Sequence, residues 1–103
     1  MGKYSPVCRA DEVPPGQARL VRVEGREIAL FNVGGTFHAT EDTCLHAGGP
    51  LHEGTLDGPV VTCPWHSWTF DVSTGQCHLN PLVKLVRYAV RVRDGTVEVG
   101  AEL

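Results

Sequence analysis

Long hydrophobic runs are missing from this chain of 103 residues. No stretch approaches the roughly 20 consecutive apolar residues that a membrane-spanning helix requires. The N-terminal run MGKYSPVCRADEVPPG also lacks the apolar core and cleavage pattern of a secretory signal. We therefore expect a soluble, cytoplasmic protein with no membrane partner. The length is typical of one domain, and we expect a single domain over residues 1–103.

Positive charge is missing from the middle of the chain. Residues 41–80 contain no Lys or Arg and carry five acidic residues, in a chain whose net charge is −3. Binding to nucleic acid needs a basic face, so this composition argues against a nucleic-acid partner. Two interpretations of the acidic segment stay open. It is either a solvated loop surface or a surface that steers the protein toward a basic partner.

Helical periodicity is also absent, and the regular segments alternate as β-strands do. Glu24-Gly25 and Asp94-Gly95 are two-residue turns of the hairpin type. In the last third, Val86, Tyr88, Val90 and Val92 are expected to share one buried face. The expected strands are Tyr4–Arg9, Ala18–Val23, Arg26–Val33, Thr36–Thr40, Pro59–Cys63, Ser67–Phe70, Gln76–Leu79, Leu85–Arg93 and Thr96–Val99. The predicted class is all-β, an antiparallel sandwich or barrel.

The segment from Glu41 to Gly58 follows no period, and a loop this long in a compact domain is usually functional. It begins with Cys44-Leu45-His46, and Cys63-Pro64-Trp65-His66 follows after sixteen intervening residues. Cysteines in a cytosolic chain favour metal or redox chemistry over disulfides. Common zinc fingers take two Cys from one arm and two His from the other. Here each arm supplies one of each, which suits a centre with two chemically different metal atoms.

This C-x-H, C-x2-H arrangement resembles the Rieske [2Fe–2S] family, in which two Cys hold one iron and two His hold the other. The runs CPWH, FDVSTG and LVRYAVRVRDGTVEV extend the resemblance to bacterial Rieske-type ferredoxins over nearly the whole chain. The resemblance implies one [2Fe–2S] cluster on Cys44, His46, Cys63 and His66. It also implies antiparallel sheets with a small, loop-rich cluster-binding subdomain at about residues 41–70.

The function implied by the resemblance is one-electron transport. The chain would take electrons from an NAD(P)H-dependent flavin reductase and pass them to the terminal oxygenase of an aromatic-ring dioxygenase system. It would not itself be an enzyme, because no acid–base pair or substrate site is visible in the sequence. Two alternatives stay open. One is the Rieske-like small subunit of an assimilatory nitrite reductase, and the other is a binding module with a structural zinc ion on the same four ligands.

The resemblance also predicts a low reduction potential. High-potential members carry a third Cys in each ligand loop, where this chain has Gly49 and Trp65. They also carry hydroxyl donors to the cluster where this chain has Trp68 and Phe70. Without such donors the reduced cluster is less stabilised, and we expect a potential of about −150 to −100 mV. Ser67 is a departure, because the family usually has Gly at that position.

Partner docking is expected near the cluster, on a small apolar surface typical of transient electron-transfer encounters. The residues expected there are Leu45, Pro64, Trp65 and Pro81. The chain is expected to be a monomer. Two further cysteines, Cys8 and Cys77, are expected to be packed free thiols, and three further histidines, His38, His52 and His78, to be packed or surface residues rather than ligands.

Overall fold

The computed structural model describes residues 3–44, 48–65 and 67–103, and these residues form an all-β fold, as predicted. Every strand pairing among them is antiparallel. The strands are β1 (Ser5–Arg9), β2 (Ala18–Val23), β3 (Arg26–Val33), β4 (Thr36–Glu41), β5 (Thr55–Asp57), β6 (Val60–Thr62), β7 (Thr69–Asp71), β8 (Arg87–Arg93) and β9 (Thr96–Glu102). Two 3₁₀ turns, η1 (Ala10–Glu12) and η2 (Leu51–Glu53), lie between them.

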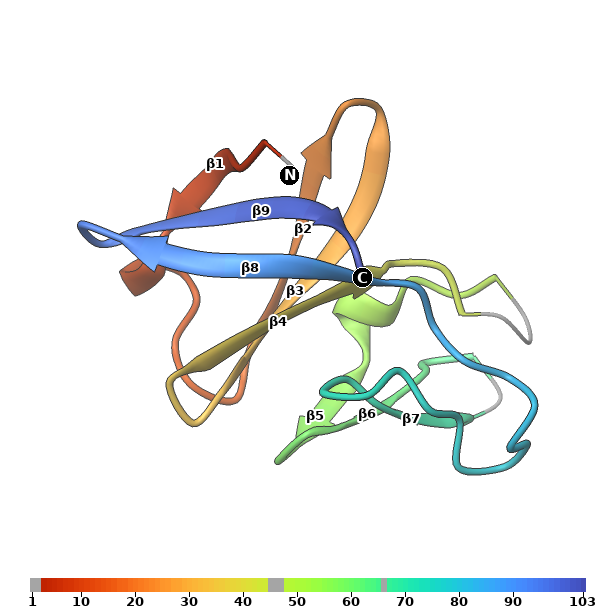
Figure 1. Cartoon of the computed structure of the whole chain (residues 1–103). Coiled ribbons are helices and arrows are strands. Elements are labelled where there is room, and N and C mark those ends of the chain that lie inside the picture. The colour runs from red at the N-terminus through yellow and green to blue at the C-terminus, as the bar shows by residue number, and fades with distance from the viewer. Residues whose placement is uncertain (1–2, 45–47, 66) are drawn as a thin grey trace.

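The strands form two sheets of unequal size. The larger has six strands in the order β1-β9-β8-β4-β3-β2, and the smaller has three in the order β5-β6-β7. Figure 1 shows the larger sheet curling on itself, with the smaller sheet lying below β4 and β8. The smaller sheet and its loops are inserted in the chain between β4 and β8, so the larger sheet is built from both ends of the sequence.

The hairpin of β2 and β3 has the bounds that the sequence predicts. Its turn residues Glu24 and Gly25 have φ values of 51° and 80°, and Asp94 and Gly95 at the β8–β9 turn have 51° and 77°. Positive φ at both central residues is the type I′ geometry, whose twist matches that of paired strands. These two turns therefore set the register of the larger sheet at both ends of the chain.

A hydrophobic core joins the two sheets. Phe31 of β3, Phe70 of β7 and Leu51 of η2 are fully buried in it. Cys44 and Cys63 belong to this core, with exposed fractions of only 1% each. A second core, around Ile28, lies within the six-stranded sheet. The two cysteines are thus fixed at the seam between the sheets rather than at the tips of free loops.

Three expectations about secondary structure were wrong. The segment expected to be irregular contains the short strand β5, which pairs with β6. The expected strand Gln76–Leu79 forms only isolated bridges from Gln76 and Cys77. Val92 is 49% exposed, so the face that packs on the core ends at Val90, shortly before the β8–β9 turn.

Two of the remaining expectations concern thiols and membrane spans. Cys77 is buried and free, and Cys8 is partly buried and free. In the described ranges, no helix is long and apolar enough to cross a membrane.

Gly54 allows the chain leaving η2 to pass directly against β6. A Cβ added there would lie 2.1 Å from the carbonyl oxygen of Thr62, so the backbone would have to move. We predict that Gly54→Ala lowers the free energy of unfolding by about 2–3 kcal/mol, as overpacking does. Gly35→Ala is the control, because Gly35 has a positive φ but nothing within 4 Å, and its cost should stay near 1 kcal/mol. Equal losses in denaturant unfolding would contradict the close packing.

Candidate metal centre

The first cysteine lies in a narrow loop that leaves the end of β4. Thr43 and Pro50 form a bridge at its base. Within the loop, the Cys44 amide donates to the Gly49 carbonyl and the Gly48 amide donates to the Cys44 carbonyl, both at 2.8 Å. The positive φ of Gly48, 76°, makes this tight reversal possible. These local hydrogen bonds fix the backbone of Cys44 and so fix the position from which its side chain projects.

The second cysteine follows β6 in a similarly closed turn. The Cys63 amide donates to the Trp68 carbonyl at 2.7 Å, which closes the turn. The Trp65 amide donates to the Cys63 sulfur at 3.4 Å. An amide that donates to sulfur favours the thiolate, which is the form that binds metal. Ser67, in the same turn, has a φ of 59°. That left-handed conformation is one that glycine adopts at lower cost than serine does.

The two loops touch at the cysteines. A Cβ added to Gly49 of the first loop would lie 3.0 Å from the Cys63 sulfur and 2.9 Å from Cγ of the Trp65 ring. Burial raises the pKa of the Cys63 thiol, the Trp65 amide lowers it in part, and the adjacent Cys44 thiol raises it further by hydrogen bonding and charge repulsion. A buried thiol whose ionisation is hindered by an adjacent thiol fits a site where a cation takes the place of the protons.

The two histidines of the predicted ligand set, His46 and His66, lie outside the described residues, as does Leu45. Among residues 3–44, 48–65 and 67–103, no three side chains of the metal-binding kinds come together. In particular, the described histidines make no such group with Cys44 and Cys63. His52 instead bonds to Asp42, and His78 bonds to the hydroxyl of Thr69.

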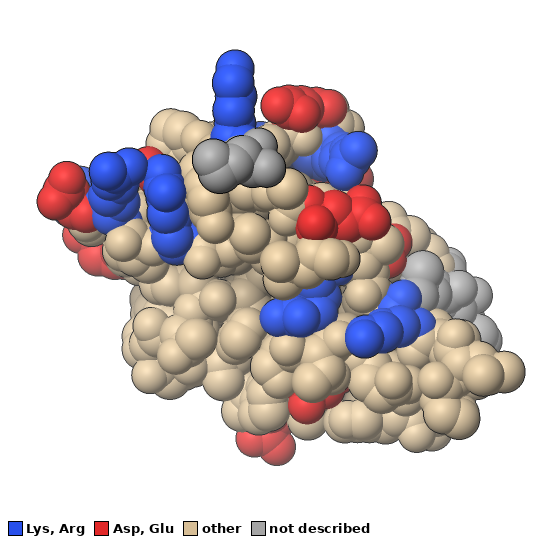
Figure 2. Space-filling view, viewed as in Figure 1, with Lys and Arg blue, Asp and Glu red and all other residues tan. Residues whose placement is uncertain are grey.

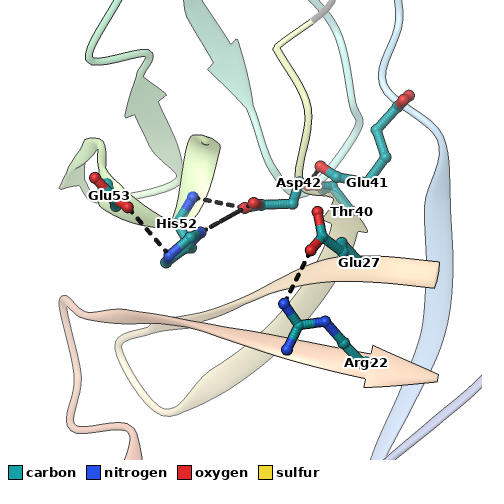
Figure 3. Close-up of polar contacts among 7 residues, drawn as sticks. All are labelled: Arg22, Glu27, Thr40, Glu41, Asp42, His52 and Glu53. Atoms are coloured by element: carbon teal, nitrogen blue, oxygen red, sulfur yellow. Dashed lines mark hydrogen bonds and ion pairs between the residues drawn. The ribbon is translucent and has the colours of Figure 1, made fainter. Parts of the chain in front are cut away.

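Asp42 holds the base of the first loop, a role that no sequence pattern indicates beyond its place two residues before Cys44. Its carboxylate accepts the backbone N–H of His52 at 2.8 Å and lies 2.9 Å from the ring Nδ1 of His52. Figure 3 shows the Asp42 side chain pointing from the end of β4 to His52 on η2. The Asp42 carbonyl also accepts the Leu51 amide at 2.7 Å. These bonds join the two ends of the loop that carries Cys44.

Trp65 is a large apolar side chain that is exposed beside the cysteines. The Trp65 side chain is 51% exposed although its ring contacts Gly49. Figure 2 shows one face of the molecule, where the lower part of the view carries acidic but no basic side chains. This distribution agrees with the lack of Lys and Arg in residues 41–80.

Comparisons with known proteins identify the class. The family model of the Rieske [2Fe-2S] domain matches residues 3–89. Ferredoxin CarAc of Metapseudomonas resinovorans is 45% identical over 98 residues, which cover 93% of this chain and 92% of that protein. The ferredoxin in a solved complex of reduced oxygenase and oxidized ferredoxin in carbazole 1,9a-dioxygenase is 44% identical, with a TM-score of 0.85 and coverage of 93% and 91%. A putative NADH-dependent nitrite reductase small subunit from Mycobacterium tuberculosis is 25% identical, with a TM-score of 0.90 and coverage of 98% and 96%.

The chain therefore belongs to the Rieske [2Fe-2S] domain family. More narrowly, it is an electron-carrying ferredoxin that holds one [2Fe–2S] cluster with Cys and His ligands, and it is not itself a catalytic enzyme. The geometry fits such a cluster, because two buried thiols from separate loops face the same point. The family membership sets aside the alternative of a structural zinc site.

The bonds from Asp42 to His52 predict a measurable weakness. Asp42→Ala would leave the His52 amide and ring N–H without their buried acceptor, and should lower the free energy of unfolding by about 1–3 kcal/mol. It should also speed bleaching of the visible absorbance in the presence of an iron chelator. The control is Asp57→Ala, which removes an equal charge from an exposed position. Bleaching at the same rate in the two variants would show that Asp42 does not hold the loop.

Proposed function

We propose that this ferredoxin carries single electrons from an NAD(P)H-dependent flavin reductase to the terminal oxygenase of an aromatic-ring dioxygenase system, in the cytoplasm and as a monomer. The observation that carries the proposal is the pairing of two buried cysteines beside an exposed tryptophan. The 45% identical relative is a ferredoxin, and the 44% identical ferredoxin of carbazole dioxygenase occurs in complex with its oxygenase.

The proposed ligands are Cys44 and Cys63 on one iron and His46 and His66 on the other. The contact of the two cysteines supports their sharing one metal atom. Bound there, the cluster would accept and release one electron at a time. The protein's part is to hold the ligands still while the charge changes, which the closed turns around both cysteines favour. We propose that residues 1–103 form one domain, with residues 41–70 as its cluster-binding subdomain.

The reduction potential follows from the donors around the cysteines. The Trp65 amide donates to the Cys63 sulfur, but Trp68 and Phe70 have no hydroxyl to add, and Phe70 is fully buried. Fewer donors stabilise the reduced cluster less. We therefore keep the expectation of a potential near the low end of the Rieske range.

A redox titration followed by EPR tests the cluster and its ligands together. The wild type should titrate as one electron at about −150 to −100 mV, and Cys63→Ser should lose the Rieske EPR signal. Cys8→Ser is the control, because Cys8 lies outside the core that holds Cys44 and Cys63 and should change neither the signal nor the potential. A potential above zero would contradict the argument from missing donors, and a Rieske signal in Cys63→Ser would contradict the ligand assignment.

Docking is proposed around the cluster, near Leu45, Pro64, Trp65 and Pro81. The exposed Trp65 ring supports this site, because aromatic anchors at the centre of an interface supply much of the binding energy. The surface is small, as suits an encounter that must end after one electron has moved.

Electron delivery to the oxygenase component of carbazole 1,9a-dioxygenase tests the function and Trp65 together. The reduced wild type should reduce this oxygenase, and Trp65→Ala should do so about tenfold more slowly at limiting concentration, with its absorption spectrum unchanged. Val92→Ala, at an exposed apolar residue on β8, is the control and should match the wild type. An equal rate for Trp65→Ala would contradict the anchor.

The likeness to the nitrite reductase small subunit, with its TM-score of 0.90, supports a second candidate function. On that reading the chain would pass electrons within an assimilatory nitrite reductase. Failure to reduce the carbazole oxygenase, under conditions where that system's own ferredoxin succeeds, would contradict the first function. Co-purification with a nitrite-reducing large subunit would then favour the second.

A further inference from the structure

A loop that packs on the same core as Cys44 and Cys63 is built around one glutamine side chain. The loop consists of residues 78–83. It begins after Cys77, and an isolated bridge between Gln76 and Lys84 joins the residues on its two sides. Below that bridge, the Leu85 amide donates to the Gly75 carbonyl at 2.7 Å. Backbone pairing therefore closes the base of the loop, and Gln76 is one of the residues that form this base.

The amide nitrogen of Gln76 faces a ring of backbone carbonyls. Its Nε2 lies 3.1 Å from the Pro81 oxygen, 3.2 Å from that of Cys77, 3.3 Å from that of Val83 and 3.5 Å from that of Asn80. Carbonyls cannot bond to one another, so four that converge need a donor among them. The Val83 and Asn80 carbonyls also accept the backbone amides of Cys77 and Val83, at 3.1 and 3.0 Å. The two N–H groups of this amide serve carbonyls from both sides of the loop and hold them together.

This loop packs on one side against the core to which the two cysteines belong and exposes leucines on the other. Val83 packs against the core that contains Cys44 and Cys63. Leu79 and Leu82 are 61% and 92% exposed. Figure 1 shows the segment between β7 and β8 at the end of the molecule that carries the three-stranded sheet. Two exposed leucines on one hydrogen-bonded loop offer an apolar surface that another molecule can cover.

We propose that Gln76 is a positioning residue for docking: its side-chain amide holds loop 78–83 in the shape that presents Leu79 and Leu82 to the terminal oxygenase. The proposal rests on the function proposed above. The oxygenase is chosen as the occupant because the loop packs on the core that holds the cysteines. In addition, the ferredoxin of the carbazole system, which covers 93% of this chain at 44% identity, occurs in complex with its oxygenase. Holding the loop before binding removes the entropy cost of ordering it at the interface.

The test starts from a variant of nearly equal size. Gln76→Glu replaces the two donors with acceptors, and its carboxylate would repel the carbonyls that Gln76 now holds. Gln76→Lys restores donors through an ammonium group and should rescue the loop. Gln17→Glu is the matched control, because Gln17 is the only other glutamine in the chain, is exposed, and gains the same charge.

The first measurement is hydrogen exchange of the ferredoxin alone. The Leu82 and Val83 amides donate to the side-chain and backbone oxygens of Asn80, so they report whether the loop is closed. Both should exchange at least about tenfold faster in Gln76→Glu and near the wild-type rate in Gln76→Lys and Gln17→Glu. The reduction potential and EPR spectrum should be unchanged in all three variants. Unchanged exchange in Gln76→Glu would overturn the proposal.

The second measurement is steady-state electron transfer to the carbazole 1,9a-dioxygenase oxygenase. For Gln76→Glu, KM for the ferredoxin should rise about tenfold with kcat nearly unchanged, at both low and high salt. A charge effect would instead fade with salt and would have opposite signs in Gln76→Glu and Gln76→Lys. Leu82→Ser, at an exposed position, should raise KM in the same way with hydrogen exchange in the rest of the chain unchanged.

The outcomes separate this proposal from the function on which it rests. Faster exchange with an unchanged KM, or an unchanged KM in Leu82→Ser, would overturn the docking role of the loop while leaving electron transfer intact. No electron delivery from the wild type would instead overturn the proposed function, and the choice of the oxygenase as occupant with it.

Discussion

The approach of two backbone segments at the cysteines is the constraint on which the rest of the structure depends. Four ligands from two separate loops can hold one cluster only if the loops come together closely. In this chain the contact is made at glycines. Gly49 lies against the Cys63 sulfur and the Trp65 ring, and Gly54 lies against the Thr62 carbonyl just before Cys63. A side chain at either glycine would push the two cysteine-bearing segments apart.

Polar side chains that are not ligands hold the irregular segments around this contact. Asp42 accepts hydrogen bonds where η2 presents free N–H groups, and Gln76 donates hydrogen bonds where a loop presents free carbonyls. Each side chain thus supplies the hydrogen-bonding partner that the nearby backbone needs: an acceptor from Asp42 and a donor from Gln76. Irregular backbone that is partly buried must find partners or lose stability. These two residues supply such partners, so the loops can be rigid without being strands.

Sequence rules worked where structure is local. The turns at Glu24 and Asp94 and the strands beside them follow from hairpin chemistry. The structure also brings Cys44 and Cys63 together, and their sharing of a metal stays a prediction. The rules failed where a distant partner decides the outcome. The strand β5 exists because β6 lies next to it, and the segment after Gln76 closes into a loop in which the Cys77 and Pro81 carbonyls accept the glutamine side chain. Such long-range pairings leave no period in the sequence.

The fixed loops also bear on how a carrier of this kind can recognise a partner briefly. A small interface gives little binding energy, so little of it can be spent on ordering loops. The hydrogen bond that closes the turn at Cys63 and those from the Gln76 side chain order these loops during folding, before any partner binds. If the acidic segment, which has no Lys or Arg, steers the protein toward a basic partner, it would act at longer range, where charge changes the encounter rate more than the lifetime of the complex. Apolar contacts at Trp65 would then govern how long the partner stays, and because they are few, it can leave quickly.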